Sequence, residues 1–183
     1  GTGDCHLLES LEGPPRFARL AQDGAALSEA QDYRIELLTD TGPASEAYGV
    51  LMLVGATRTE FAGSHLDLVL GEPADPGVAP APDPDAPDRY RRMHRAILAG
   101  LVTACHDVSE GGVAVALAEL CIAGQLGALI DALPGDDAVS ALFSESTGRF
   151  IVEVRPEHVD SFHELIDGAA HVIGTVTDDG LLT

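Results

Sequence analysis

Lysine and tryptophan are both absent from this chain of 183 residues. Its ten basic residues are therefore all arginines, and 30 acidic residues give a formal net charge of −20. Such an excess of negative charge argues against nucleic acid or an anionic membrane surface as a partner. Aromatic residues make up only 4% of the chain, so Ala, Val, Leu and Ile must form the core. With 45% hydrophobic residues at this length, we expect one domain around one core.

Cysteine is also scarce, and long apolar runs are missing. Cys5, Cys105 and Cys121 lie far apart without a CxxC spacing, which argues against a disulfide framework and against a thiolate metal site. The longest apolar run is interrupted by Glu119 and is too short to span a bilayer, and no signal peptide is visible. We therefore expect a cytoplasmic protein with reduced thiols.

The most informative stretch runs from Leu101 to Gly124. Residues 101–108 are rich in apolar and β-branched side chains and predict a buried strand, and residues 113–124 are apolar on nearly every side and predict a buried helix. The turn Asp107-Val-Ser-Glu-Gly-Gly112 lies between them. A strand that enters a helix through such a turn directs free backbone N–H groups to one point, which suits an anion.

Two interpretations of this turn stay open from the residues alone. It lacks the GxxxxGK[ST] spacing of a P-loop. Asp107 and Glu110 would repel a bare phosphate, but they suit a Mg²⁺ ion held between carboxylate and phosphate oxygens. In the alternative interpretation, Ser109 caps the helix and the two glycines allow close packing.

Three stretches in the right order resemble the phosphoribosylformylglycinamidine synthase family. Residues 106–119, His-Asp-Val-Ser-Glu-Gly-Gly-Val-Ala-Val-Ala-Leu-Ala-Glu, resemble a signature in the second half of its synthetase subunit, in the C-terminal AIR-synthase-like domain. Residues 49–64 resemble the family's strand and "E-L-G-G-S" turn, and residues 142–150 its "L-F-S-E-S-x-G-R-F" segment. The resemblance covers about residues 49–181. It implies an α+β fold, a single domain with a mixed sheet covered by helices.

The resemblance also implies a function. Members of this family are ATP-dependent ligases of purine biosynthesis that use Mg²⁺, and they convert formylglycinamide ribonucleotide to its amidine with ammonia released from glutamine. It implies that the turn helps to bind nucleotide or substrate, through His106, Asp107, Ser109, Glu110, Gly111 and Gly112. Asp107 and Glu110 would be the metal ligands. The implied partners are the missing synthetase domains and a glutaminase subunit or domain. Because the family's N-terminal domain is missing here, we expect the chain alone to be inactive.

Two alternatives of other classes stay open. The domain could bind nucleotide structurally, or hold subunits together, without catalysing a reaction. It could also belong to another member of the AIR synthase superfamily, such as a selenophosphate synthetase, a thiamine-phosphate kinase or a hydrogenase maturation factor. The corresponding turn there would resemble D-x-T-x-G-G, from which Ser109 and Glu110 depart.

The remaining chain divides into two parts. Residues 1–48 are an unassigned lead-in segment with an expected helix over 16–27 and a strand over 33–38, and residues 49–183 form the domain. Apolar patterns predict strands over 50–56, 127–131, 150–154 and 171–176, and helices that end near Leu142 and Gly168.

The region between residues 72 and 99 is unusual in composition. Residues 72–88 contain six prolines and five acidic residues, which predicts an extended, partly disordered surface loop. Asp88 is the expected N-cap of a helix over 89–99 that carries four of the ten arginines. We interpret these arginines as a solvated helix face; the alternative is a docking face for a phosphate-bearing ligand or for a partner domain.

Overall fold

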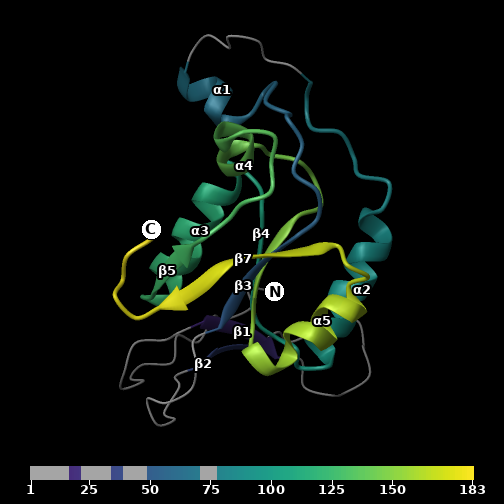
Figure 1. The fold of residues 1–183 in the computed structure, drawn as a ribbon, viewed down its shortest axis with the longest axis vertical. Helices are drawn as coiled ribbons and strands as arrows, with labels where there is room; N and C mark the ends of the chain where they lie inside the picture. The colour runs from purple at the N-terminus through teal and green to yellow at the C-terminus, as the bar shows by residue number, and fades with distance from the viewer. Residues whose placement is uncertain (1–16, 22–33, 39–48, 71–77) are drawn as a thin grey trace, which may run out of the picture.

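Five strands form the central sheet of the computed structural model, which describes residues 17–21, 34–38, 49–70 and 78–183. They are β3 (Val50–Val54), β4 (Val102–Asp107), β5 (Gly127–Ile130), β6 (Phe150–Val154) and β7 (Ala170–Thr177), in the order β4-β6-β3-β7-β5 (Figure 1). Neighbouring strands pair antiparallel, and the isolated bridges Glu60–Val78 and Ala128–Leu182 are parallel. The expected α+β fold is confirmed.

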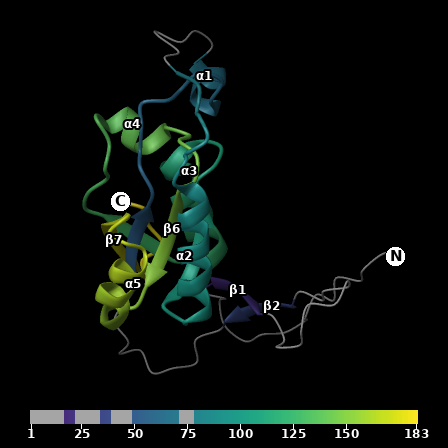
Figure 2. The same ribbon diagram turned by 90° about the vertical axis from the view of Figure 1, so that its right-hand side faces the viewer.

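Helices cover both faces of this sheet. Helix α3 (Gly112–Gly124) lies on one face, and α2 (Ala86–Leu98) lies on the other with α5 (Val159–Leu165), which follows a 3-10 turn at Pro156–His158. The short helices α1 (His65–Leu70) and α4 (Ala138–Phe143) lie together beyond one end of the sheet (Figures 1 and 2). The expected helices over 89–99 and 113–124 and those that end near Leu142 and Gly168 are present, although their bounds differ by a few residues.

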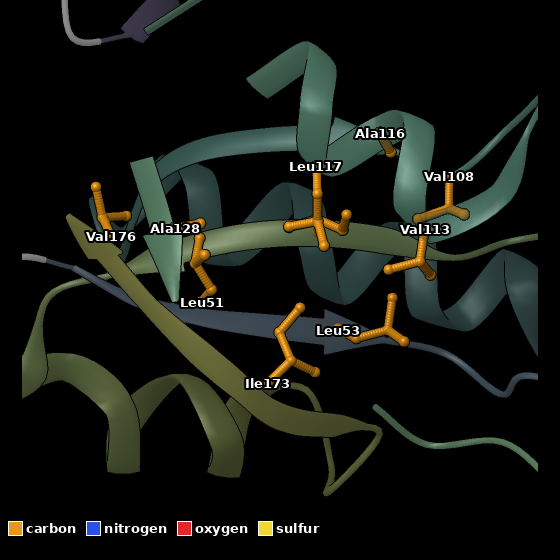
Figure 3. Packing of buried hydrophobic residues seen from close by; sticks show 10 residues of the cluster. Leu51, Leu53, Val108, Val113, Ala116, Leu117, Ala128, Ile173 and Val176 are labelled. Carbon is orange, nitrogen blue, oxygen red and sulfur yellow. The ribbon is translucent and has the colours of Figure 1, made fainter. Parts of the chain in front are cut away.

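Strand β3 shows how the two faces are filled. Successive side chains of a strand point to opposite faces. Leu51 and Leu53 therefore pack toward α3, against Val113 and Leu117 (Figure 3). Met52 and Val54, which alternate with these leucines, point to the other face and belong to the second cluster with Met93 and Phe162. Burial on both faces explains why this strand is a continuous apolar run instead of an alternating one.

The helix expected over residues 16–27 is wrong where the structure describes it. Phe17–Ala21 form strand β1, which pairs antiparallel with β2 (Arg34–Leu38). The strand expected over 33–38 is confirmed. A strand partner beyond the local window outweighs local helix propensity, so a local pattern could not show this pairing. Residues 1–16, 22–33 and 39–48 lie outside the described part of the chain.

Part of the proline-rich segment is buried against the domain. Residues 72–77 lie outside the described chain, but from residue 78 onward the segment is described, and Asp83 is only 5% exposed. Helix α2 begins at Ala86 with Asp85 as its N-cap residue, so the expected start after Asp88 is wrong. The reason is a buried ion pair: Asp83 Oδ2 lies 3.0 Å from Arg89 Nη2, which ties the segment to the first turns of the helix.

No helix in the described part of the chain is both long enough and apolar enough to cross a lipid bilayer.

Candidate functional site

The three stretches that carry the family resemblance meet at one end of the sheet, and Glu145 joins them. Its Oε1 atom accepts a hydrogen bond from the backbone N–H of His65 at 2.8 Å and a second from the N–H of Gly111 at 2.8 Å. These partners are 80 and 34 residues away in sequence. One carboxylate oxygen thus fixes the turn before α1 and the turn before α3 to the segment that follows α4.

Arg149 holds the same segment through a second set of hydrogen bonds. Its side chain is buried, and Nε donates to the carbonyl of Ser146 at 3.0 Å while Nη1 donates to Thr57 Oγ1 at 3.0 Å. Nη2 donates to the carbonyl of Ser144. Burial lowers the pKa of Arg149 to about 10, against the opposing effect of the Glu60 carboxylate. The guanidinium therefore holds the loop of residues 144–147 against the loop that follows β3.

The two glycines of the α3 turn serve the packing of this junction. Gly112 has φ +70°, and a Cβ atom there would lie 2.7 Å from the carbonyl oxygens of both Leu142 and Ser144. Gly111 is the N-cap residue of α3 with φ +79°. The interpretation of Ser109 as a helix cap is wrong, since its hydroxyl donates to the Asp107 carboxylate instead. The close packing expected in the alternative interpretation is present at Gly112.

The backbone N–H groups of these glycines are already used within the protein. The Gly111 N–H donates to Glu145, and the Gly112 N–H donates to the carbonyl of Ser109 at 3.1 Å. The turn was expected to direct free N–H groups at a bound anion. A carboxylate of the chain itself takes that place at the N-terminus of α3, where negative charge is favourable.

An open pocket of about 450 Å³ lies beside this junction. Its walls include Tyr90, Asp107, Ser109, Glu145, Thr147 and Gly148. Of the six expected site residues, Asp107 and Ser109 line this pocket. His106, Glu110, Gly111 and Gly112 do not.

His106 lies on the opposite side of β4 from Asp107, as alternation along a strand requires. Its Nδ1 donates to the carbonyl of Asp107 at 2.6 Å, and its Nε2 lies 3.4 Å from the Glu119 carboxylate on α3. Glu110 is exposed. His106 therefore joins β4 to α3, and Asp107, whose side chain is 68% exposed, is the acidic group of β4 that faces the pocket.

The expected magnesium ligands stay a prediction. Among the described residues, no group of three or more His, Cys, Asp and Glu side chains could hold a metal ion. Mg²⁺ is commonly held by one or two carboxylates together with substrate phosphates and water. Asp107 suits that arrangement because it is exposed in the pocket, whereas Glu110 lies outside the pocket wall.

The residues of this pocket that sequence reasoning missed include Tyr90, Glu145 and Thr147. A signal existed for two of them, since residues 142–150 form a polar segment after a helix and were matched to a family motif. The hydroxyl of Thr147 donates to the carbonyl of Ala81 at 2.7 Å, which brings the proline-rich segment to the site. Tyr90 packs edge-on against Phe150, with ring centroids 5.6 Å apart, and no local pattern marks it as a pocket residue.

The curated relatives of this chain include PurL subunits from two bacteria. The chain is 40% identical over 139 residues to phosphoribosylformylglycinamidine synthase subunit PurL of Lactobacillus helveticus, a match that covers 75% of this chain and 18% of that protein. The PurL subunit of Limosilactobacillus reuteri is 40% identical over 127 residues, which are 69% of this chain and 17% of that protein. The chain thus spans less than a fifth of the length of these relatives.

Solved structures show the same fold. PurL of Thermotoga maritima complexed with FGAR superposes with a TM-score of 0.62 at 22% identity, over 78% of this chain and 26% of that chain. The hydrogenase maturation protein HypE superposes with a TM-score of 0.52 at 19% identity, over 79% of this chain and 50% of that chain. Residues 49–183 match the family described as AIR synthase related protein, C-terminal domain. This match covers most of the chain, so the protein belongs to the family of AIR synthase related proteins.

Proposed function

We propose that this chain is the C-terminal AIR-synthase-like domain of a synthetase of purine biosynthesis. The reaction is the ATP-dependent conversion of formylglycinamide ribonucleotide to formylglycinamidine ribonucleotide, with ammonia from glutamine, in the cytoplasm. The supporting relatives are PurL subunits at 40% identity. In this proposal the domain forms one wall of the nucleotide and substrate site.

The pocket between the three converging segments carries this proposal. Asp107, Ser109 and Thr147 present a carboxylate and two hydroxyls along its wall. Such groups accept hydrogen bonds from the hydroxyl and amide groups of a ribonucleotide, and the protons of the two hydroxyls are already donated to Asp107 and to the Ala81 carbonyl. Asp107 would repel a phosphate unless a cation lay between them. The pocket therefore suits the sugar and amide parts of the substrate better than a bare phosphate.

ATP and Mg²⁺ enter the proposal as groups that the full enzyme holds. Solved structures of PurL from Thermotoga maritima include a complex with ATP. In this chain Asp107 is the residue available to a Mg²⁺ ion, which would neutralise the charge of transferring phosphate groups. Glu110 and the backbone of Gly111 and Gly112 would act only after a rearrangement, because Glu145 now holds the Gly111 N–H.

The domain is one part of a larger site in this proposal. Its partners are the other synthetase domains and a glutaminase subunit or domain. The 183-residue chain alone should then release no ADP from ATP with formylglycinamide ribonucleotide, ammonia and Mg²⁺. Turnover by the chain alone at the rate of a full synthetase would contradict the proposal.

A domain exchange tests the proposal directly. Residues 49–183 would replace the matching domain of the Lactobacillus helveticus PurL subunit, and ammonia-dependent ADP release would be measured. We expect an active chimera that loses at least tenfold in kcat/KM on Asp107→Asn or Ser109→Ala. Asp160→Asn, an exposed acid on α5, is the matched control and should retain activity.

Two outcomes would count against this function. A chimera with a cooperative thermal transition but no turnover would favour the non-catalytic alternative, in which the domain binds nucleotide structurally or assembles subunits. Wild-type kinetics in both pocket variants would show that neither side chain contributes to substrate binding or catalysis.

A further inference from the structure

The exposed face of α2 carries a second pocket beside the first. Arg91, His94 and Arg95 are spaced i, i+3 and i+4, which places their side chains on one face of the helix. Together with Tyr90 they line an open pocket of about 420 Å³. Tyr90 also lines the pocket that contains Asp107, so the two pockets adjoin at this residue.

The positive charge of this face is only partly neutralised. The buried Arg89 is paired with Asp83, and Arg92 lies 3.1 Å from the carboxylate of Asp167. Arg95, by contrast, has no side-chain hydrogen bond or ion pair among the described residues. What distinguishes Arg95 is that this guanidinium without a partner among the described residues lies on a pocket wall.

Arg91 contributes to the same imbalance. Its Nη1 lies 2.6 Å from Asp88 Oδ1, but both side chains are more than 60% exposed, so this pair is weak and open to exchange. Like charges at i and i+4, as at Arg91 and Arg95, destabilise a helix. Binding of an anion between the two guanidinium groups would relieve that repulsion.

We infer that this face binds the phosphate monoester of a sugar-phosphate ligand whose uncharged polar part occupies the Asp107 pocket. The inference rests on the proposed function and adds the orientation of the ligand. Guanidinium groups bind phosphate oxygens in a bidentate manner. The carboxylates of Asp107 and Glu145 repel phosphate from the first pocket and accept hydrogen bonds from hydroxyl and amide groups there. The phosphate therefore points toward Arg95.

A binding experiment with the 183-residue chain tests this orientation. Dissociation constants would be measured by calorimetry for formylglycinamide ribonucleotide, for its dephosphorylated ribonucleoside, and for ribose 5-phosphate. The variant is Arg91→Gln with Arg95→Gln, because glutamine keeps helix propensity while it removes both charges. Arg155→Gln, an exposed arginine outside both pockets, is the matched control.

We expect the ribonucleotide to bind at least tenfold more tightly than the ribonucleoside, as one charge-assisted hydrogen bond allows. This ratio should fall to about one or two in the double variant, with ribonucleoside binding unchanged, and it should persist in the control. A ratio that survives in the double variant would overturn the inference. So would the absence of binding by all three compounds.

Failure of the proposed function gives a different result. If ribose 5-phosphate binds in an arginine-dependent manner while the ribonucleotide binds no better, the phosphate subsite stands. The proposed substrate is then wrong.

Discussion

The junction around Glu145 and the exposed face of α2 lie next to each other and are built in opposite ways. At the junction the charged side chains have partners: Glu145 accepts two backbone hydrogen bonds, and Arg149 donates to three oxygens. On α2, Arg95 has no such partner among the described residues. The comparison shows that the residues most visible as motifs are largely used for architecture. The groups free to meet a ligand are Asp107, which lies inside one motif, and Arg95, which lies outside all of them.

The largest expected loss of stability comes from a glycine of the junction, and a control glycine separates the cost of a steric clash from the cost of a positive φ. Gly112→Ala should lower the free energy of unfolding by about 3–5 kcal/mol, because the added Cβ meets two carbonyl oxygens and φ is positive. Gly63→Ala is the matched control, since Gly63 also has a positive φ, +79°, but no atom lies within 4 Å of its Cβ position. It should lose only about 1–2 kcal/mol. Urea denaturation measures both, and equal losses would contradict the close approach.

A second variant tests the buried ion pair between the proline-rich segment and α2. Asp83→Asn leaves Arg89 buried without its carboxylate partner and should lower the free energy of unfolding by about 3 kcal/mol at pH 7. Asp88→Asn removes the exposed partner of Arg91 instead and should change it by less than about 1 kcal/mol.

The same pair sets a dependence on pH. Burial opposes ionisation of Asp83, but hydrogen bonds from Asp85 and Arg89 and the charges of Arg89 and Arg58 outweigh it, so the pKa of Asp83 lies below its ordinary value of 3.8. A depressed carboxyl pKa adds stability that is fully present above the unfolded-state pKa and is lost as pH falls through the folded-state pKa. Wild type and Asp83→Asn should therefore converge in urea midpoint below about pH 4. A constant difference from pH 7 to pH 3 would contradict this origin.

The smallest effect distinguishes an acceptor from a charge at Glu145. Glu145→Ala leaves the N–H groups of His65 and Gly111 without their acceptor, which should cost about 1–2 kcal/mol of unfolding free energy. Glu145→Gln keeps a carbonyl oxygen at that position and should retain more than half of this contribution. If Gln and Ala variants unfold at the same urea concentration, the negative charge at the α3 N-terminus matters and the acceptor does not.

Local pattern predicted the elements of the domain because each carries its own periodicity. The strands at 50, 102, 127, 150 and 170 and the helix after Gly112 follow from apolar runs and their boundaries. Local sequence patterns could not predict contacts between residues that lie far apart in the chain. Strand β1 pairs with β2, and the segment before α2 contacts that helix through the Asp83–Arg89 pair.

The site was predicted less well than the fold for the same reason. Asp107 ends β4 and Ser109 follows it, and both line the pocket, while their role in binding stays a prediction. His106 was named too, although alternation along β4 directs it to Glu119. Glu145 and Tyr90 reach the pocket from segments 38 residues after and 17 residues before Asp107, and only the folded sheet brings them there.

The single oxygen shared by two amides has a consequence for hydrogen exchange. The N–H groups of His65 and Gly111 both donate to Glu145 Oε1. A change in the side-chain rotamer of Glu145 therefore breaks both hydrogen bonds at once. Their protons should therefore exchange with solvent deuterium in one opening event, although the two residues belong to different turns. Protection measured at one amide would report on the other, and a ligand that draws Glu145 away would expose both together.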